Sequence, residues 1–270
     1  SQIINIGDLL STLYELYDNV EYNKAITYSF GYLEYITYIQ SLHSAYKARV
    51  ISPCKFSTKA TKLEEQYYIA HCNDNFTTNT ITLDKNYIIT GPNASGKTTL
   101  LKSTLLNILF SQQFGMGCYK RAKITPYNNV FCYLNIPDTS DRDSLFQAEA
   151  RRCLDILHAV KEEKEDGLSL CIFDELYSGT NPEEASLAAK AYLKYLSTIN
   201  IRFLLTTHYY DICDLDKINK SIKNIHMQSY YDDSNILHYS YTIKPGTSHI
   251  KGGCQVLHQM DYPRAVLDHL

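Results

Sequence analysis

The 270-residue sequence contains no tryptophan, only three methionines and no strong excess of charge of either sign. Its 26 Lys and Arg residues nearly balance its 29 Asp and Glu residues, giving a formal net charge of -3. The chain as a whole therefore lacks the electrostatic footprint of a nucleic-acid-binding protein, although a local patch or another part of a longer protein could still bind DNA. It also has no apolar run long enough to cross a bilayer and no signal peptide, so we expect no membrane contact and no secretion.

The eight cysteines include no C-x-x-C pair, which argues against a zinc site. Several lie in apolar runs, as Cys171 does in Leu-Cys-Ile-Phe, and we expect reduced, buried thiols in an intracellular protein. The chain begins at Ser1 without methionine and almost directly on a helical pattern. One interpretation is that it is a fragment of a longer protein.

The pattern of predicted secondary structure divides the sequence into three blocks. Apolar residues at helical spacing predict helices in residues 1–53, with Asp8 as an N-cap. Residues 54–245 alternate short apolar strands with amphipathic helices, which predicts an α/β fold with a largely parallel sheet flanked by helices. Residues 246–270 follow Pro-Gly and predict a short helical tail. The expected strands are 66–70, 80–83, 87–90, 129–134, 168–173 and 201–206, and the expected helices are 97–111, 144–163 and 183–198.

Residues Gly91–Thr98 fit the phosphate-binding pattern G-x-x-x-x-G-K-[ST], between a β-branched run and an apolar helical pattern. A strand, a glycine loop and a helix N-terminus surround an anion with backbone N–H groups and the positive helix end. Lys97 can reach the β- and γ-phosphates of a nucleotide, and the Thr98 hydroxyl can ligate Mg²⁺. The chain is therefore predicted to bind a nucleoside triphosphate.

Two further strand ends supply candidate catalytic groups. Asp174 and Glu175 end an apolar strand, where a nucleotide-hydrolysing α/β domain carries a metal-holding Asp and a Glu that orients or deprotonates water. A strand end turning into solvent would give the same pattern. His208 closes the run 201–206 and is a candidate γ-phosphate sensor or water-polarising group. A lone histidine in this position is more often structural.

Six segments in order resemble the MutS mismatch-repair ATPase family. The loop Thr90–Thr99 resembles T-G-P-N-x-x-G-K-S-T, in which the inner Pro92-Asn93 is more specific than the general pattern. The others are Phe76–Asn79 for F-x-x-N, Ser144–Glu149 for S-x-F-x-x-E, Asp174–Thr180 for D-E-[IL]-x-x-G-T, Thr207–Tyr209 for T-H-Y, and Gly253, Val256 and Pro263 for the C-terminal element. The resemblance runs from about residue 25 to the end of the chain.

This resemblance implies a P-loop NTPase fold of the ABC-like type and an ATPase that uses ATP, ADP and Mg²⁺. Phe76 would stack on the adenine, unless it is an ordinary core side chain. Ser144 would reach the γ-phosphate in the other subunit of a homodimer or heterodimer, a role compatible with capping the following helix. Residues 1–53 would end the core and lever helices, residues 246–270 would form a helix-turn-helix that clasps the partner, and DNA would bind mainly outside this chain. The implied nucleotide contacts are Gly91, Pro92, Asn93, Ala94, Ser95, Gly96, Lys97, Thr98, Thr99, Phe76 and Ser144 in trans; the catalytic residues are Glu175, Lys97 and His208; the metal ligands are Thr98 and Asp174.

The segment Ser178–Pro182 resembles the MutS-like relatives at least as well as the mismatch-repair members, which leaves the subfamily open. Two positions also depart from the family pattern. Gly252 replaces the family's usual tyrosine, and residues 138–143 are more acidic than usual and lack a glycine. Three hypotheses therefore stand: a MutS-type repair or recombination ATPase, an ABC-type transport or chromosome-maintenance ATPase, and a binding module in which ATP is only a structural clip. The second needs an L-S-G-G-Q-like signature before the Asp174 strand, and none exists. The third is opposed by the presence of Glu175, Thr98 and His208.

Overall fold

The structure is a computed structural model, and its chain divides into two compact units, Ser1–Ile51 and Ser52–Leu270. Each unit is described by itself. Among the described residues, no helix is both long and apolar enough to cross a membrane. The described residues are 6–71, 76–134, 145–161, 167–234, 236–250, 252, 260 and 262–267.

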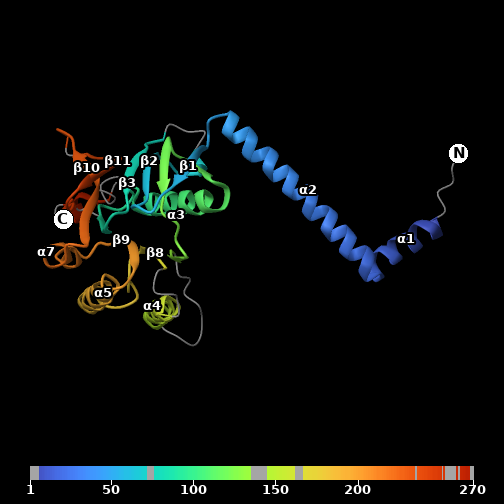
Figure 1. The fold of residues 1–270 in the computed structure, drawn as a ribbon. Coiled ribbons are helices and arrows are strands. Elements are labelled where there is room, and N and C mark those ends of the chain that lie inside the picture. The colour runs from blue at the N-terminus through green and yellow to red at the C-terminus, as the bar shows by residue number, and fades with distance from the viewer. Residues whose placement is uncertain are drawn as a thin grey trace. The chain divides into compact units, whose positions relative to one another are not determined.

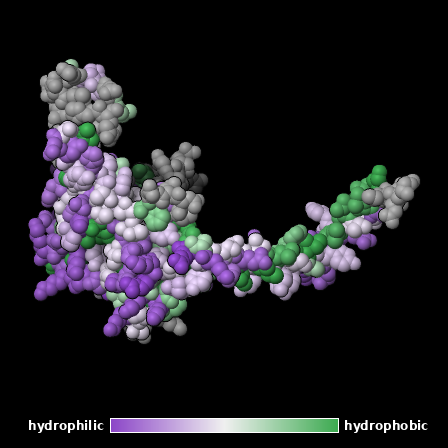
Figure 2. Space-filling view, turned by 90° about the horizontal axis from the view of Figure 1, so that it is seen from above, coloured by the Kyte–Doolittle hydropathy of each residue, from purple (hydrophilic) through white to green (hydrophobic). Residues whose placement is uncertain are grey.

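The described residues of the N-terminal unit form two helices, α1 (Ile6–Asp18) and α2 (Val20–Lys47) (Figure 1). They are separated at Asn19, whose side chain accepts hydrogen bonds from two backbone N–H groups at the start of α2 and so caps it. The predicted N-cap was wrong, because α1 already begins at Ile6 and Asp8 lies in its first turn. Neither helix buries a side chain, and Figure 2 shows apolar surface along them.

The second unit is built on a six-stranded sheet in the order β11-β10-β4-β9-β8-β7. The five strands from β10 to β7 pair in parallel, and only β11 is antiparallel to its neighbour. Strands β4 and β8 are buried almost throughout, as expected for parallel strands covered on both faces. The strands are β4 (Asn86–Thr90), β7 (Asn129–Tyr133), β8 (Ser169–Asp174), β9 (Ile201–Thr206), β10 (Ile222–Tyr231) and β11 (Leu237–Pro245).

A second, five-stranded mixed sheet has the order β3-β2-β6-β1-β5. Only β1 and β6 pair in parallel, and the other three pairings are antiparallel. Its strands are β1 (Ser52–Phe56), β2 (Lys62–Gln66), β3 (Asn79–Thr82), β5 (Met116–Gly117) and β6 (Arg121–Ile124).

Helix α3 (Lys97–Phe114) contacts both sheets and shares one core with them. Helices α4 (Leu145–Lys161) and α5 (Pro182–Leu196) cover the opposite face of the six-stranded sheet (Figure 1). The pleat of β8 sorts its side chains accordingly: Leu170 and Ile172 face α3, whereas Cys171 and Phe173 face α4 and α5. The short helices are η1 (Ile69–His71), α6 (Tyr210–Cys213), α7 (Leu215–Ile218) and α9 (Arg264–Leu267).

The α/β prediction is confirmed, but the expectation of one largely parallel sheet holds only for the six-stranded sheet. The five-stranded sheet was missed, because its strands are short and carry charged residues, as in Arg-Ala-Lys-Ile of β6. The strand predicted at 66–70 was wrong, since β2 ends at Gln66 and a 3₁₀ turn follows. Among the described cysteines four are buried, but Cys132 is exposed, contrary to expectation. Nearly half of the predicted helix-turn-helix at 246–270 lies outside the described residues, and its described part includes the short helix α9.

Candidate functional site

The carboxyl ends of three neighbouring parallel strands meet at one edge of the six-stranded sheet. Strand β4 runs into the Gly91–Thr98 loop, β8 ends at Asp174, and β9 ends at Thr206. In register, Thr206 lies beside Ile89 on one side and beside Asp174 on the other. Since ligands of open α/β sheets bind beyond the carboxyl ends of the strands, this edge is the expected place for a site.

The backbone of the Gly91–Thr98 loop requires glycine at both ends. Gly91 has φ of 152°, and a Cβ there would lie 2.7 Å from the Ser95 hydroxyl oxygen. Gly96, at φ of 95°, precedes the first residue of α3, and its Cβ would lie 3.2 Å from the ring of Tyr241. Ala94 also has a positive φ, of 62°, which is costly for a residue with a Cβ. The loop is therefore strained into one conformation that wraps the N-terminus of α3.

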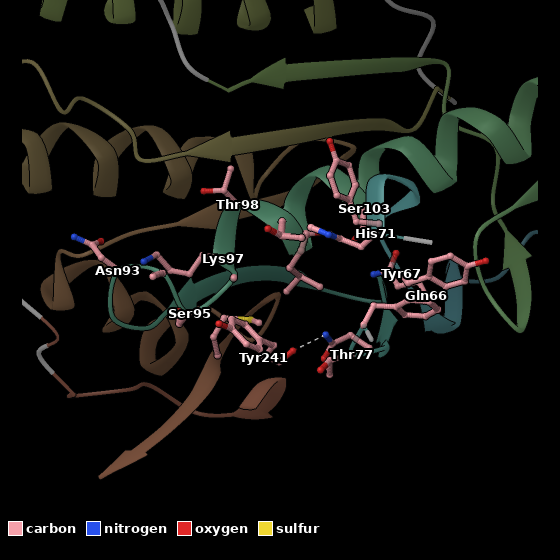
Figure 3. A pocket seen from close by; sticks show the side chains of 18 of the residues that line it. Gln66, Tyr67, His71, Thr77, Asn93, Ser95, Lys97, Thr98, Ser103 and Tyr241 are labelled. Carbon is pink, nitrogen blue, oxygen red and sulfur yellow. Dashed lines mark hydrogen bonds between the residues drawn. The ribbon is translucent and has the colours of Figure 1, made fainter. Parts of the chain in front are cut away.

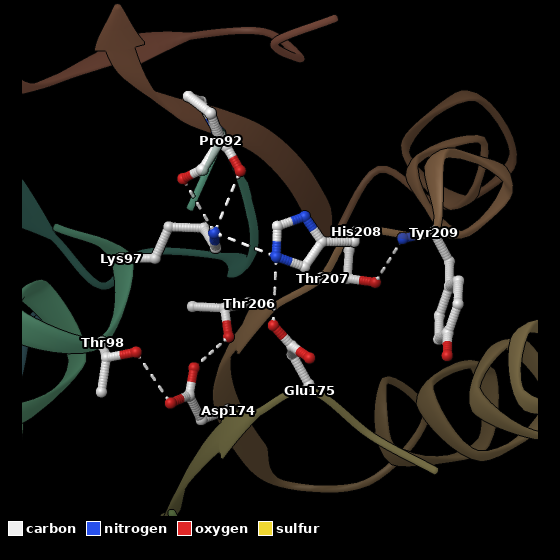
Figure 4. A network of polar contacts seen from close by, with 10 residues as sticks. Pro92, Lys97, Thr98, Asp174, Glu175, Thr206, Thr207, His208 and Tyr209 are labelled. Carbon is white, nitrogen blue, oxygen red and sulfur yellow. Dashed lines mark hydrogen bonds and ion pairs between the residues drawn. The ribbon is translucent and has the colours of Figure 1, made fainter. Parts of the chain in front are cut away.

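Lys97 is buried beneath this loop (Figure 4). Its Nζ donates to the backbone oxygens of Gly91, at 3.0 Å, and Pro92, at 3.1 Å, and lies 3.2 Å from Nε2 of His208. Burial lowers the pKa of the Lys97 ammonium, and the nearby carboxylates of Glu175 and Asp174 oppose that shift. The Lys97 ammonium is thus a partly desolvated cation at the N-terminus of α3. A bound phosphate could replace the two backbone carbonyls as its hydrogen-bond acceptor.

His208 lies between Lys97 and Glu175, and both contact the same ring nitrogen. The distance from Nε2 to Oε1 of Glu175 is also 3.2 Å. A hydrogen bond to His208 lowers the pKa of Glu175, and the charge of Lys97 adds to this effect, while partial burial opposes it. Because one imidazole nitrogen cannot accept from Lys97 while donating to Glu175, the two groups compete for it. If Lys97 turned toward a phosphate, Nε2 would become free to donate to Glu175.

Asp174 is held from two sides by hydroxyl groups (Figure 4). Its Oδ2 accepts from Thr98 at 2.8 Å, and its Oδ1 accepts from Thr206 at 2.5 Å. A carboxylate and a hydroxyl at the base of an anion-binding loop are the hard oxygen ligands that Mg²⁺ prefers beside phosphate. The donor set of Thr98 and Asp174 therefore fits this metal.

A cavity of about 490 Å³ opens in front of the loop (Figure 3). Lys97, Thr98 and Glu175 line its polar end. Phe76 lies at the other end, 39% exposed, with one ring face stacked on Tyr67 at a centroid distance of 4.4 Å. The exposed part of the Phe76 ring is therefore accessible to a planar ligand in the cavity. The cavity thus combines a phosphate-binding end with an aromatic end.

Strand β11 closes this cavity with Tyr241, which has φ of 56°. The Asn79 side chain donates to the Tyr241 carbonyl at 2.8 Å and accepts from the Ile243 N–H at 2.9 Å. Asn79 therefore clamps the segment that carries Phe76 to β11. This explains why an asparagine follows Phe76 at a spacing of three.

The C-terminal segment touches the same loop. The Ser248 N–H donates to the Thr90 hydroxyl at 2.9 Å. Gly252 is buried, and a Cβ at this position would lie 2.8 Å from the Pro92 side chain. No larger side chain fits there in this arrangement, which gives a physical reason for glycine in place of tyrosine.

The structure brings together nearly all residues predicted for the site. Lys97, His208 and Glu175 form one polar cluster and Thr98 and Asp174 form a second, while Phe76 and loop residues 93–98 line the cavity. Ser144 lies outside the described residues.

Sequence reasoning gave no site role to Thr206, Tyr241 or Glu149, although Glu149 ends the matched S-x-F-x-x-E segment. Glu149 is 2% exposed and accepts three hydrogen bonds from the loop after Glu175. The signal for Glu149 was available, because it falls on the buried stripe of α4 with Cys153 and Ile156. Tyr241 had no local signal.

Comparison with known proteins gives a consistent result. Residues 87–270 match the protein family described as MutS domain V. The protein "DNA mismatch repair protein MutS" of Lactobacillus gasseri is 30% identical over 187 residues, covering 67% of this chain and 21% of that protein. Proteins of the same description from Listeria welshimeri and Leuconostoc citreum are 26% and 27% identical, each covering 72% of this chain and 22% of the relative.

The chain therefore spans only about a fifth of the length of these curated relatives. The family match itself covers well over half of the chain, and it includes the phosphate loop, the Asp174–Glu175 pair and His208. The chain belongs to the MutS family and contains its domain V, a P-loop ATPase domain.

Proposed function

We propose that this chain binds ATP in the cavity before the Gly91–Thr98 loop and hydrolyses it to ADP and phosphate, as the ATPase region of a MutS-type protein in DNA mismatch repair or recombination. The observation that carries the proposal is the meeting of two polar clusters, Lys97–His208–Glu175 and Thr98–Asp174–Thr206, beside the cavity that Lys97, Thr98 and Glu175 line. These side chains come from three strand ends, so their convergence is specific to the folded chain.

In this proposal, backbone N–H groups of the loop and the Lys97 ammonium hold the β- and γ-phosphates. Glu175 accepts a proton from the water that attacks the γ-phosphorus, and the bond to the β-phosphate oxygen breaks. The hydrogen bond and positive charge beside Glu175 lower its pKa and keep it ionised at neutral pH, as a proton acceptor must be. His208 positions Glu175 and senses whether Lys97 is engaged with phosphate.

Thr98 and Asp174 are the residues that would hold Mg²⁺, and Thr206 fixes the second carboxylate oxygen of Asp174. When bound, the ion would neutralise charge on the phosphate oxygens. Adenine would stack on the exposed ring of Phe76 in the cavity that Tyr241 also lines. Removing one such stack typically weakens binding by about 1–3 kcal/mol.

Several features of the proposal concern the larger assembly. The chain acts as half of a homodimer or heterodimer, inside the cell, with DNA held mainly by regions outside it. Ser144 reaches the nucleotide of the partner subunit, so a separate subunit binds ATP but hydrolyses it poorly. Residues 1–53 form the end of the core and lever region, residues 54–245 the ATPase domain of ABC-like type, and residues 246–270 a dimerisation element. ATP binding and hydrolysis would switch the dimer between DNA-bound states.

The family assignment favours this hypothesis over an ABC-type transport or chromosome-maintenance ATPase. Within the MutS family, the choice between mismatch repair and a recombination role depends on DNA-binding regions beyond these residues. The ATPase activity itself is common to both.

Two substitutions test the catalytic assignment. Glu175→Ala should keep ATP binding and abolish turnover, whereas Lys97→Ala should abolish both. Binding is measured by isothermal titration and turnover by phosphate release. Wild-type turnover in Glu175→Ala would contradict the role of this carboxylate.

A mixing experiment tests the composite site. A Ser144→Ala chain is mixed with a Lys97→Ala chain, so that the mixed dimer binds nucleotide only on the Ser144→Ala subunit. The intact Ser144 of the other subunit should then restore turnover at that single site. Turnover no higher than that of the two separate variants would count against a role in trans.

A further inference from the structure

The loop that follows Asp174 is strained and is held from one side by helix α4. Glu175 and Tyr177 have φ of 57° and 59°, a backbone region that non-glycine residues rarely adopt. Such conformations persist only where the surroundings enforce them, and they cluster at functional sites. The contacts of this loop therefore decide where the Glu175 carboxylate points.

Glu149 supplies the strongest of these contacts. Its Oε1 accepts from the Ser178 N–H at 3.1 Å and from the Ser178 hydroxyl at 2.9 Å, and its Oε2 accepts from the Gly179 N–H at 3.1 Å. Both carboxylate oxygens are thus used, in a position that is 2% exposed. Within the part of the chain that the structure describes, no ion pair joins Glu149 to a cation. The three donors of this loop, with the Tyr133 hydroxyl nearby, are what satisfy the buried carboxylate.

Two further contacts join the loop to the first turn of α4. A Cβ at Gly179 would lie 2.6 Å from the Phe146 nitrogen and 2.8 Å from the Leu145 side chain, so the backbones are in close approach. The ring of Phe146 packs on that of Tyr177 at a centroid distance of 5.7 Å. Because packed interiors transmit displacement, the loop cannot keep its conformation if the start of α4 moves.

We propose that Glu149 is a positioning residue, which holds the loop after Asp174 so that Glu175 faces the attacking water. Through this contact, Glu149 makes hydrolysis depend on the position of the start of α4. Leu145 directly follows Ser144, the residue proposed to reach the partner's nucleotide. Glu149 would thus link occupancy of one nucleotide site to turnover at the other. This inference rests on the proposed hydrolytic role of Glu175.

The test uses the full-length protein with Glu149→Gln. This substitution preserves the size of the side chain but replaces one carboxylate oxygen by an NH₂ group, which cannot accept a hydrogen bond from Ser178 or Gly179. The phosphate loop is untouched, so nucleotide affinity should change by less than about threefold while kcat falls by on the order of tenfold to a hundredfold. Asp155→Asn is the matched control, since it removes a carboxylate from the exposed face of the same helix, and it should leave both quantities unchanged. An unchanged kcat, or a kcat and affinity that fall together, would overturn the inference.

A double variant separates positioning from general support of the fold. If Glu149 acts through Glu175, adding Glu149→Gln to Glu175→Gln should not lower the residual turnover further. If Glu149→Gln lowers the turnover of Glu175→Gln by the same factor as it lowers that of the wild type, its effect is independent of Glu175 and structural, and the inference is refuted. Wild-type turnover in Glu175→Gln alone would instead refute the proposed function.

Ser178→Ala covers the case in which Glu149→Gln fails to fold. It removes one of the three donors from an exposed residue, so kcat should fall by a smaller factor at unchanged affinity. A kcat equal to that of the wild type would overturn the inference.

Discussion

The two hydroxyl groups on Asp174 lead to a prediction about Thr206. This residue is fully buried in β9, and its hydroxyl donates to Oδ1 of Asp174. Thr206→Val keeps the shape and the β-branched side chain but removes that donor. Asp174 would then have one carboxylate oxygen without its protein partner and would retain only the bond from Thr98.

A hydrogen bond to a charged group contributes about 1.5–3 kcal/mol to stability. We therefore expect Thr206→Val to lower the free energy of unfolding by about that amount. The neighbouring Thr207 is the matched control, since it is also buried but its hydroxyl accepts only from the neutral Tyr209 N–H at 2.9 Å. Thr207→Val should cost about 0.5–1.5 kcal/mol.

The assay is urea unfolding followed by far-UV circular dichroism without nucleotide, with equal m-values required for the comparison. A second readout is the Mg²⁺ concentration that gives half-maximal turnover, which should rise for Thr206→Val alone because Asp174 is no longer held in place. A stability loss no greater than that of Thr207→Val would refute the reasoning. So would an unchanged Mg²⁺ requirement.

Three further predictions concern stability. Lys97→Met should abolish ATP binding without lowering the free energy of unfolding, because burial already disfavours the ammonium; a loss above about 1 kcal/mol in urea unfolding would contradict this. Burial raises the pKa of Cys153 from 9.0 to about 11, so the neutral thiol stabilises the fold below pH 9 and this contribution is lost as pH rises to 11. The loss is on the order of 2 kcal/mol, and Cys153→Ala should show a shallower decline in unfolding free energy over that window; an equal decline would exclude this cause. Gly179→Ala should cost about 1–3 kcal/mol through its clash with Phe146, whereas Gly31→Ala in α2 meets no atom within 4 Å and should stabilise its helix, as thermal unfolding of both variants would reveal.

Local sequence was enough for the elements around the loop. The strands at 80–83, 87–90, 129–134, 168–173 and 201–206 and the three central helices agree with the structure within a few residues. Except for the strand at 80–83, which is β3 of the five-stranded sheet, these elements are long or strongly apolar, and their pattern reflects burial on both faces of a parallel sheet. The rest of the five-stranded sheet escaped prediction because short strands with charged residues depend on partners far away in the chain.

The residues of the site also divide into those that local sequence predicts and those that depend on the tertiary fold. Glycines with positive φ, a lysine at a helix N-terminus and carboxylates at a strand end are short-range features, so Gly91–Thr98 and Asp174-Glu175 predicted a nucleotide site and the MutS resemblance. Thr206 reaches Asp174 only because β8 and β9 are adjacent and in register, and Tyr241 reaches the cavity only because β11 extends the sheet.

Glu149 shows the distinction most clearly. The sequence by itself placed it in a predicted helix, at the end of a segment that resembles the MutS family. Only the tertiary structure placed both of its oxygens against the loop that carries Glu175, because that contact joins backbone groups 29 and 30 residues away. Residue type and local periodicity determine which atoms are available for chemistry, whereas packing across the sheet decides which of them meet.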